Sequence, residues 1–153
     1  MTQTMDAQSR YDEMTESLVG RGVFITPKRA KLLEILAGAD SHPSVSELHA
    51  QVQLRYPSTS LATVYNTIEL LKECGQVLEM EFSGAANRYD GRRAAPHTHV
   101  VCLECERIED ADELESDGAY ASIEERTGYD ITSHRLDYFG ACPGCQTREP
   151  GAH

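Results

Sequence analysis

Long apolar runs, basic charge and cysteine are all scarce in this chain of 153 residues. No apolar run is long enough to cross a bilayer, so we expect no membrane-spanning helix and no membrane partner. The first twenty residues are polar and acidic, and they lack the apolar segment of a secretory signal peptide. We therefore expect a cytoplasmic protein.

Basic side chains are outnumbered, with 14 Lys and Arg against 25 Asp and Glu and a formal net charge of −11. Such a balance at first argues against a nucleic-acid partner. The acid is unevenly placed, however: residues 91–153 hold six Arg and 13 acidic residues, whereas residues 20–72 hold six basic and four acidic ones. The N-terminal part is thus mildly basic and could approach phosphate.

Only five cysteines occur, and four of them form the two Cys-x-x-Cys pairs Cys102–Cys105 and Cys142–Cys145. Each pair places two sulfurs on one tight turn, and two pairs supply the four thiolates that Zn²⁺ binds in a structural site. Two disulfides are the alternative, but cytosolic chains with this pattern bind metal more often. We therefore expect a structural zinc site made of four cysteines, and we interpret Cys74 as a small buried apolar residue of a helix.

Helix and turn signals alternate through the first half of the chain. The expected helices span residues 11–19, 28–36 and 62–72, and the expected strands span residues 77–82 and 87–89. A further helix is expected between Lys28–Leu36 and residues 62–72: Ser44 or Ser46 caps it, Val45, Leu48 and Val52 form its apolar stripe, and Pro57 stops it. Thr26 and Pro27 form a helix start, and Ser44 with Glu47 fits a capping box. The last three of these helices, followed by a hairpin, have the order of a winged helix-turn-helix, with residues 62–72 as the recognition helix. An ordinary helical bundle with a hairpin is the alternative.

A second metal signal precedes the first cysteine pair. His97 and His99 enter a candidate strand, in which residues i and i+2 point to the same face, so both can bind one ion. Asp110 follows a candidate partner strand and can bring a carboxylate alongside. Such a mixed set suits Fe²⁺, Mn²⁺ or Zn²⁺. Spacing alone leaves open that the two histidines are only exposed polar residues.

The C-terminal part indicates a small α/β domain. We expect a helix at residues 112–127, with Ile123 facing inward, and a strand at residues 129–138. With the strands near Val100 and Ile108 this makes a three-stranded sheet that suits pairing across a two-fold axis. The predicted fold class is α+β, with a winged-helix DNA-binding domain at 1–90, a hinge at 91–96, and an α/β dimerisation and zinc-binding domain at 97–153.

Short segments along the chain match one family pattern. They are Ile25–Arg29, Ser41–Pro43, Ser60–Thr67, Asn87–Asp90, His97–Cys105, His134–Leu136 and Gly140–Cys142. On these segments the chain resembles the ferric uptake regulator (Fur) family, and most of all its peroxide-sensing PerR branch. The resemblance covers residues 11–145. It implies a dimeric, metal-activated transcriptional repressor, and no enzyme, with a winged helix joined by a hinge to a dimerisation domain.

The resemblance also assigns ligands. The four paired cysteines match the structural zinc site. The regulatory site for Fe²⁺ or Mn²⁺ is matched by His42, Asp90, His97, His99 and Asp110. Since these ligands come from both sides of the hinge, metal binding is expected to set the angle between the domains and so to be linked to DNA binding.

Two carboxylates indicate the branch. Fur-type members usually carry Glu at the positions of Asp90 and Asp110, whereas both are Asp here, as in the peroxide-sensing branch. That likeness implies that bound Fe²⁺ reacts with hydrogen peroxide, that His42 or His97 is oxidised, and that metal and DNA are then released. Manganese should support this chemistry far more slowly.

Contacts with double-stranded operator DNA are expected mainly from Arg29 and Tyr65, on the resemblance and on their chemistry. Arg29 suits a phosphate or a minor-groove edge, and Tyr65 can touch a thymine methyl group. Lys28, Thr63 and Asn66 are further candidates. Two other functions stay open: a Fur-type iron or manganese level sensor without peroxide chemistry and, more distantly, a non-haem metal enzyme that uses His97, His99 and Asp110.

Overall fold

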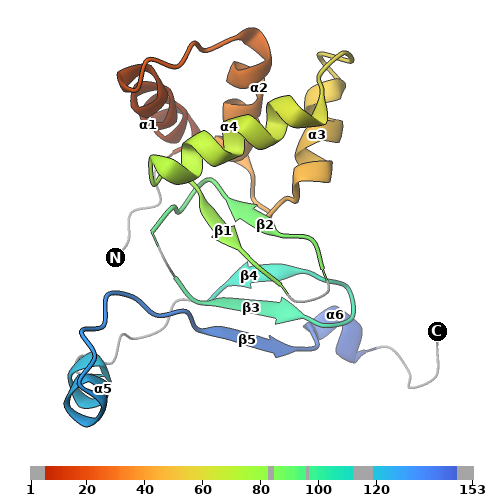
Figure 1. The fold of residues 1–153 in the computed structure, drawn as a ribbon. Helices are drawn as coiled ribbons and strands as arrows, with labels where there is room; N and C mark the ends of the chain where they lie inside the picture. The colour runs from red at the N-terminus through yellow and green to blue at the C-terminus, as the bar shows by residue number, and fades with distance from the viewer. Residues whose placement is uncertain (1–5, 83–84, 96, 112–118, 148–153) are drawn as a thin grey trace. The chain divides into compact units, whose positions relative to one another are not determined.

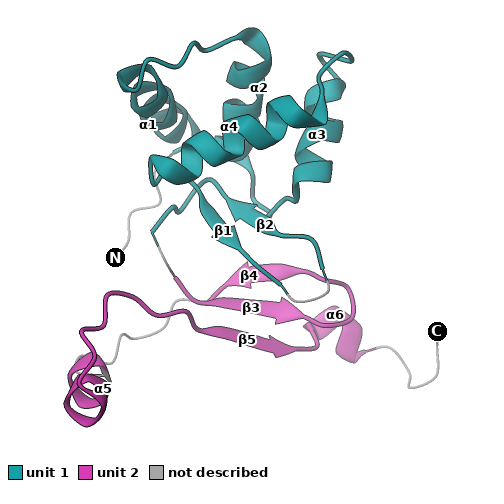
Figure 2. Cartoon of the chain, in the orientation of Figure 1, with its two compact units in different colours: residues 1–95 teal, residues 96–153 magenta. Residues whose placement is uncertain are grey.

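A computed structural model of the chain describes residues 6–82, 85–95, 97–111 and 119–147. The chain divides into two compact units, Met1–Ala95 and Pro96–His153 (Figure 2), and each is described by itself. The predicted domain at 1–90, the hinge at 91–96 and the domain at 97–153 stay a prediction. Among the described residues, none of the helices has both the length and the apolar character that a membrane span requires.

Four helices form most of the first unit, and a side chain caps the start of each. They are α1 (Ala7–Gly20), α2 (Pro27–Gly38), α3 (Val45–Gln53) and α4 (Leu61–Glu73) (Figure 1). As predicted, Thr26 caps α2. Of the two caps considered for α3, Ser44 and Ser46, it is Ser44 that accepts a hydrogen bond from the backbone N–H of Glu47. These bonds satisfy N–H groups that have no acceptor within their own helix.

Helix α1 is longer than the expected helix at residues 11–19. The carboxylate of Asp6 accepts a hydrogen bond from the backbone N–H of Ser9, and the helix therefore begins one turn earlier. The backbone N–H and the hydroxyl of Ser9 both donate to this carboxylate, and they lower the pKa of Asp6 because they favour its ionised form. The polar first turn has no apolar periodicity, which is why a pattern based on apolar spacing misses it.

One apolar core lies between the four helices. Leu18, Leu33, Leu48 and Ile68, one from each helix, are fully buried in it. They lie on the apolar face that a spacing of three and four residues creates on a helix. Burying such side chains contributes about 1.5–3 kcal/mol each, so this core is the main source of stability of the first unit.

A short antiparallel hairpin completes the first unit. Its strands are β1 (Leu78–Met80) and β2 (Arg88–Asp90), and Leu78 lies opposite Asp90. Strand β1 is shorter than the expected strand at residues 77–82, whereas β2 is as long as the expected strand at 87–89 and lies one residue later. Residues 83 and 84 lie outside the described part. Gly75, with φ of +68°, ends α4 in the left-handed conformation that glycine adopts without strain. Helices followed by this hairpin confirm the predicted winged helix.

The second unit is built on a three-stranded sheet. Its elements are β3 (His99–Cys102), β4 (Ile108–Asp110), α5 (Ala119–Thr127), β5 (Asp137–Gly140) and α6 (Pro143–Gln146). The strand order is β4-β3-β5, with β4 antiparallel and β5 parallel to the central strand (Figure 1). The predicted α/β domain with a three-stranded sheet is confirmed.

Two local expectations in this unit are wrong. The strand expected at residues 129–138 forms only from Asp137, and Tyr129 is 74% exposed in the connection that follows α5. Ile123, expected to face inward, is 41% exposed. Tyr129 and Ile123 could be buried only against a neighbouring apolar surface, and the described part of this unit provides none that covers them. Residues 112–118, the first part of the expected helix at 112–127, lie outside the described residues.

Candidate metal centres and nucleic-acid interface

The four paired cysteines form one cluster at an end of the sheet of the second unit. Cys102 ends β3, Cys105 lies in the turn that follows, Cys142 precedes α6 and Cys145 lies within it. One sulfur from each lies within 4.8 Å of the others, and the sulfurs of Cys105 and Cys142 are 3.7 Å apart. All five cysteines of the chain are free thiols, so the disulfide alternative is not realised.

Backbone hydrogen bonds shape this cluster. The backbone N–H of Cys102 donates to the carbonyl of Arg107, and that of Leu103 donates to the carbonyl of Gly140. Glu106, with φ of +64°, turns the chain back towards β4. The two sulfur-bearing turns are thus held by the sheet itself, one at the end of β3 and one at the end of β5.

The thiols of the cluster differ in acidity. Backbone N–H groups of Cys105 and Cys142 donate to the sulfur of Cys102 and lower its pKa to about 6. Hydrogen bonding with Cys142, together with burial and the neighbouring thiolate charge, raises the pKa of Cys145. Closely spaced thiols lose their protons one after another, because each thiolate opposes the next. A divalent cation removes that repulsion, and four sulfur donors suit Zn²⁺.

The expected regulatory ligands fall into two groups, one in each unit. In the second unit, His99 lies opposite Asp110 in the pairing of β3 with β4. The nearest Asp110 oxygen is 3.0 Å from Nε2 of His97 and 3.5 Å from Nε2 of His99. The two imidazole rings are 4.3 Å apart between centroids. The structure therefore brings these three predicted ligands together on one side of the sheet.

Asp137 joins this group and was not anticipated from the sequence. It lies opposite His99 in the parallel pairing of β3 with β5, and its Oδ1 is 3.5 Å from Nδ1 of His99. Its other oxygen accepts a hydrogen bond from Nε of Arg135 at 2.6 Å. A signal was present in the sequence, since Asp137 interrupts the apolar run Leu136–Phe139 with a charge.

In the first unit, His42 and Asp90 are both buried and lie together. The Nε2 atom of His42 is 3.3 Å from Oδ2 of Asp90. The segment that carries His42 runs beside β2: the backbone N–H of Tyr89 donates to the carbonyl of Pro43, and the Arg88 side chain donates to the carbonyl of His42. The structure thus places two predicted ligands side by side at the end of the hairpin.

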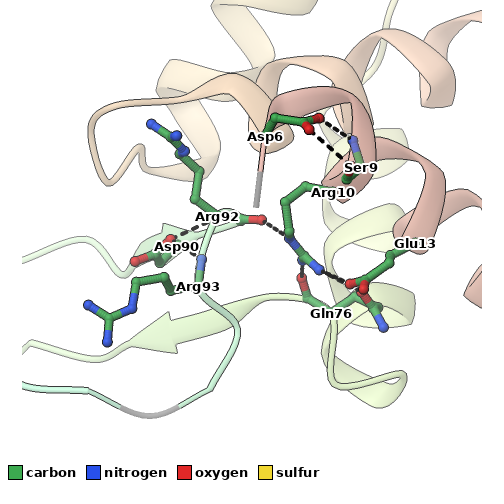
Figure 3. Close-up of polar contacts among 9 residues, drawn as sticks. Asp6, Ser9, Arg10, Glu13, Gln76, Asp90, Arg92 and Arg93 are labelled. Atoms are coloured by element: carbon green, nitrogen blue, oxygen red, sulfur yellow. Dashed lines mark hydrogen bonds and ion pairs between the residues drawn. The ribbon is translucent and has the colours of Figure 1, made fainter. Parts of the chain in front are cut away.

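The carboxylate of Asp90 is oriented by the chain that follows it. Its Oδ1 accepts hydrogen bonds of 2.9 Å from the backbone N–H groups of Arg92 and Arg93 (Figure 3). One oxygen is therefore occupied by the backbone, and the other faces His42. The first unit thus brings together one histidine and one aspartate, and the second unit brings together two histidines and one aspartate. Histidine nitrogen and carboxylate oxygen form a donor set that suits Fe²⁺ and Mn²⁺.

The expected DNA contacts lie on α2 and α4. Tyr65 is 49% exposed, and Asn66 is exposed beside it on α4. Thr63 is half-buried, and its hydroxyl lies 2.9 Å from that of the capping residue Ser60. The exposed part of α4 thus presents a phenol and an amide, both of which can hydrogen-bond a base edge or a phosphate.

Arg29 and Lys28 lie in the first turn of α2, and both contact other groups of the first unit. Arg29 donates to the carbonyl of Phe24 at 2.9 Å and lies 3.4 Å from the hydroxyl of Thr67. Lys28 lies 3.5 Å from the carbonyl of Ser58. Arg29 therefore ties the start of α2 to α4, and a contact of either cation with DNA stays a prediction.

Known proteins resemble this chain over most of its length. The ferric uptake regulator family model matches residues 20–139. The peroxide operon regulator of Bacillus subtilis (strain 168) is 33% identical over 148 residues, which cover 94% of this chain and 98% of the relative. A Campylobacter jejuni peroxide stress regulator is 28% identical with a TM-score of 0.63, and the match covers 88% of this chain and 97% of that one.

A more distant structure supports the same fold. The Helicobacter pylori ferric uptake regulator has a TM-score of 0.79 at 21% identity, with 98% of this chain and 100% of that chain covered. At this identity the likeness concerns the fold alone. Family model, sequence relatives and fold agree, and they confirm the resemblance drawn from the sequence: the chain belongs to the ferric uptake regulator family.

Proposed function

We propose that this protein is a dimeric, metal-dependent transcriptional repressor that responds to peroxide. One observation carries the proposal: both candidate carboxylate ligands are aspartates, and each lies beside a histidine. Asp90 is 3.3 Å from His42, and Asp110 is 3.0 Å from His97. Relatives that cover nearly the whole chain are named for peroxide response.

A regulatory Fe²⁺ or Mn²⁺ would be bound by His42, Asp90, His97, His99 and Asp110. The first two belong to one unit and the last three to the other, so an ion held by all five would favour one arrangement of the units. Metal binding and DNA binding would then be linked, and each would strengthen the other by the same factor. This ligand assignment is supported by the local geometry within each unit.

A bound Fe²⁺ would supply the redox chemistry that cleaves the O–O bond of hydrogen peroxide next to its ligands. In the overall reaction, one peroxide oxygen would be inserted into a C–H bond of a ligand imidazole, and the other oxygen would leave as water. His42 and His97 are the candidates for this oxidation. Each is held against an aspartate, so its ring would remain beside the ion during the reaction. An oxidised imidazole is a poorer ligand, and the loss of one ligand favours release of the metal and of DNA.

A structural Zn²⁺ would occupy the four-cysteine cluster of the second unit. The three strands of this unit bury few apolar side chains, chiefly Val101 and Ile108. Small units with so thin a core depend on metals or disulfides for stability. We therefore assign the zinc a structural role, separate from the regulatory ion.

DNA binding and dimerisation would use different units. In the first unit, α4 would enter the major groove, with Tyr65 and Asn66 at base edges and Arg29 at the backbone. In the second, exposed apolar side chains would pair across a two-fold axis; Val100, Tyr138 and Phe139 of the sheet are 39–56% exposed. We place the protein in the cytoplasm, with its operator, and infer no enzymatic activity.

DNA binding before and after peroxide tests the proposal. The zinc-loaded protein is charged with Fe²⁺ or Mn²⁺, treated with a modest dose of hydrogen peroxide, and assayed for binding to its own upstream DNA. Mass spectrometry then follows the peptides that contain His42 and His97. His49 and His134, which lie outside the expected ligand set, serve as internal controls for unspecific oxidation.

We expect only the iron form to lose DNA, with one added oxygen on His42 or His97 and none on the control histidines. If both metal forms keep DNA and all histidines stay unmodified, peroxide sensing is refuted and metal-level sensing replaces it. If neither metal increases DNA affinity, the regulatory site itself is refuted.

A further inference from the structure

Arg10 is a buried cation that no part of the metal or DNA sites accounts for. It lies in α1, and only 4% of its surface is exposed. Arginine is rarely buried unless its donors are paired, because an unpaired charge is costly to remove from water. Its partners therefore indicate what holds it inside the first unit.

The guanidinium of Arg10 joins α1 to two distant segments. Its Nε donates to the carbonyl of Gly91 at 2.9 Å, and its Nη2 donates to the carbonyl of Gln76 at 2.7 Å (Figure 3). Its Nη1 contacts the side chains of Gln76 and Glu13. Two of its donors thus reach backbone carbonyls on either side of the hairpin, one before β1 and one after β2.

Gly91 is held on another side by α2. A Cβ atom built on Gly91 would lie 2.6 Å from the carbonyl oxygen of Leu36 and 2.9 Å from its carbonyl carbon. The obstacle is backbone, which cannot move aside as the end of a flexible side chain can. The backbone at Gly91 is therefore fixed by the Arg10 hydrogen bond and by close packing on α2.

Asp90 directly precedes this fixed point. The two N–H groups that orient its carboxylate, from Arg92 and Arg93, directly follow it (Figure 3). The path of the backbone through Gly91 thus determines where both the carboxylate and its two donors lie. A shift of Gly91 would move the Asp90 oxygen that faces His42.

We propose that Arg10 is a positioning residue of the regulatory metal site, acting on Asp90 through the carbonyl of Gly91. The inference rests on the proposed function, in which Asp90 is a metal ligand. A purely structural role is the competing explanation: Arg10 would then only fasten α1 to the hairpin. The two explanations differ in what happens to metal affinity, because only a positioning residue changes the ligand geometry.

Calorimetric titration of the zinc-loaded, full-length protein with Mn²⁺ distinguishes a positioning role of Arg10 from a purely structural one. The variants are Arg10→Met, which removes all donors, and Arg10→Lys, which keeps the charge but lacks the planar arrangement of donors. Arg21→Met is the matched control, since Arg21 follows α1 and binds Glu73 of α4 at 3.1 Å. The melting temperature of each variant is measured in chelator and in saturating Mn²⁺.

For Arg10→Met we expect a Kd for Mn²⁺ at least about tenfold higher and a smaller Mn²⁺-induced rise in melting temperature, with unchanged zinc content. Arg10→Lys should lie between wild type and Arg10→Met, and it keeps the test decisive if Arg10→Met fails to fold. Arg21→Met should keep the wild-type Kd.

Equal losses of melting temperature with and without Mn²⁺, at a wild-type Kd, would overturn the inference and leave Arg10 a structural residue. Asp90→Asn is measured alongside. If Asp90→Asn binds Mn²⁺ as wild type does, the ligand assignment fails, and with it the role given to Arg10. If Asp90→Asn loses Mn²⁺ but both Arg10 variants do not, only the inference about Arg10 fails.

Discussion

His99 and Asp137 are partners in the parallel pairing of β3 with β5, with 3.5 Å between Nδ1 of the imidazole and Oδ1 of the carboxylate. The other ring nitrogen, Nε2, faces Asp110. A carboxylate on one nitrogen of a ligand histidine orients the ring and leaves the second nitrogen for a metal. Asp137 is thus placed to support His99, and Arg135 holds its second oxygen.

Replacing Asp137 by Asn keeps its shape and removes its charge. We expect Asp137→Asn to weaken Mn²⁺ binding by about 10- to 100-fold, the usual effect of losing a carboxylate behind a ligand histidine. Calorimetric titration measures this, with Asp130→Asn as the control because Asp130 is exposed after α5. Equal Mn²⁺ affinities of Asp137→Asn and wild type would contradict the supporting role.

Loss of one clustered thiol should unfold the second unit. Cys105→Ser is expected to abolish zinc retention and to remove the cooperative thermal transition of this unit, since zinc binding and folding are coupled in small metal-dependent units. Zinc analysis and circular dichroism test the prediction. Cys74→Ser is the control, because Cys74 lies in the first unit, at the end of α4. A folded, zinc-free Cys105→Ser protein would show that the metal is dispensable for the fold.

A methyl group at Gly91 should destabilise the first unit. The backbone of Leu36 would lie 2.6 Å from the added Cβ, so Gly91→Ala is expected to cost about 1–3 kcal/mol of unfolding free energy. Gly20→Ala, also in the first unit, is the matched control because nothing lies within 4 Å of its Cβ position. Urea denaturation distinguishes the two; similar midpoints would mean that the close approach to α2 relaxes without cost.

Glu79 of β1 contacts Lys72 of α4 and Tyr89 of β2, and we expect these contacts to make the stability of the first unit depend on pH. Burial tends to raise the pKa of Glu79, but hydrogen bonds from Lys72 and Tyr89 outweigh it, so the pKa of Glu79 is lowered below its ordinary value of 4.5. The stabilisation by its carboxylate is therefore present above pH 4.5 and is lost as pH falls through the lowered pKa.

The pKa of Lys72 is raised, chiefly by its hydrogen bond to Glu79. The stabilisation from Lys72 is therefore complete below pH 10.5 and is lost at still higher pH.

Glu79→Gln should lower the free energy of unfolding by about 1–2 kcal/mol at pH 7, and the difference in unfolding free energy from wild type should vanish in strong acid. Urea denaturation at several pH values checks this, with the exposed Glu81→Gln as control. A difference that persists unchanged in strong acid would rule out the ionised carboxylate as its source.

Local features of the fold could be predicted from the sequence alone. Thr26 caps α2 as expected, and Ser44 is one of the two caps expected for α3, because a cap and the N–H group it binds are only three residues apart. The position of Asp110 beside His99 could also be predicted, since strand periodicity places His97 and His99 on one face and the partner strand follows closely in the sequence.

Other features depended on surroundings that local patterns do not describe. The strand expected at residues 129–138 begins only at Asp137, because β5 extends only as far as β3 can pair with it, from Asp137 to Gly140. Ile123 has the spacing of a core residue but is exposed in a unit whose own core is small. Helix or strand periodicity states which residues share a face, but not whether that face is covered.

The sequence by itself indicated the winged-helix order and the two cysteine pairs, since residue type and short spacing encode them. Its resemblance to the family, carried by motifs along the whole chain, indicated the family and the set of histidines and aspartates proposed to bind the regulatory metal. Only the tertiary structure decided that Asp137 lies behind His99 and that Arg10 reaches Gly91, 81 positions further along the chain. Such contacts depend on strand register and helix packing. Both arise when the whole chain folds, because the free energy of burying and pairing distant groups, not local propensity, selects them.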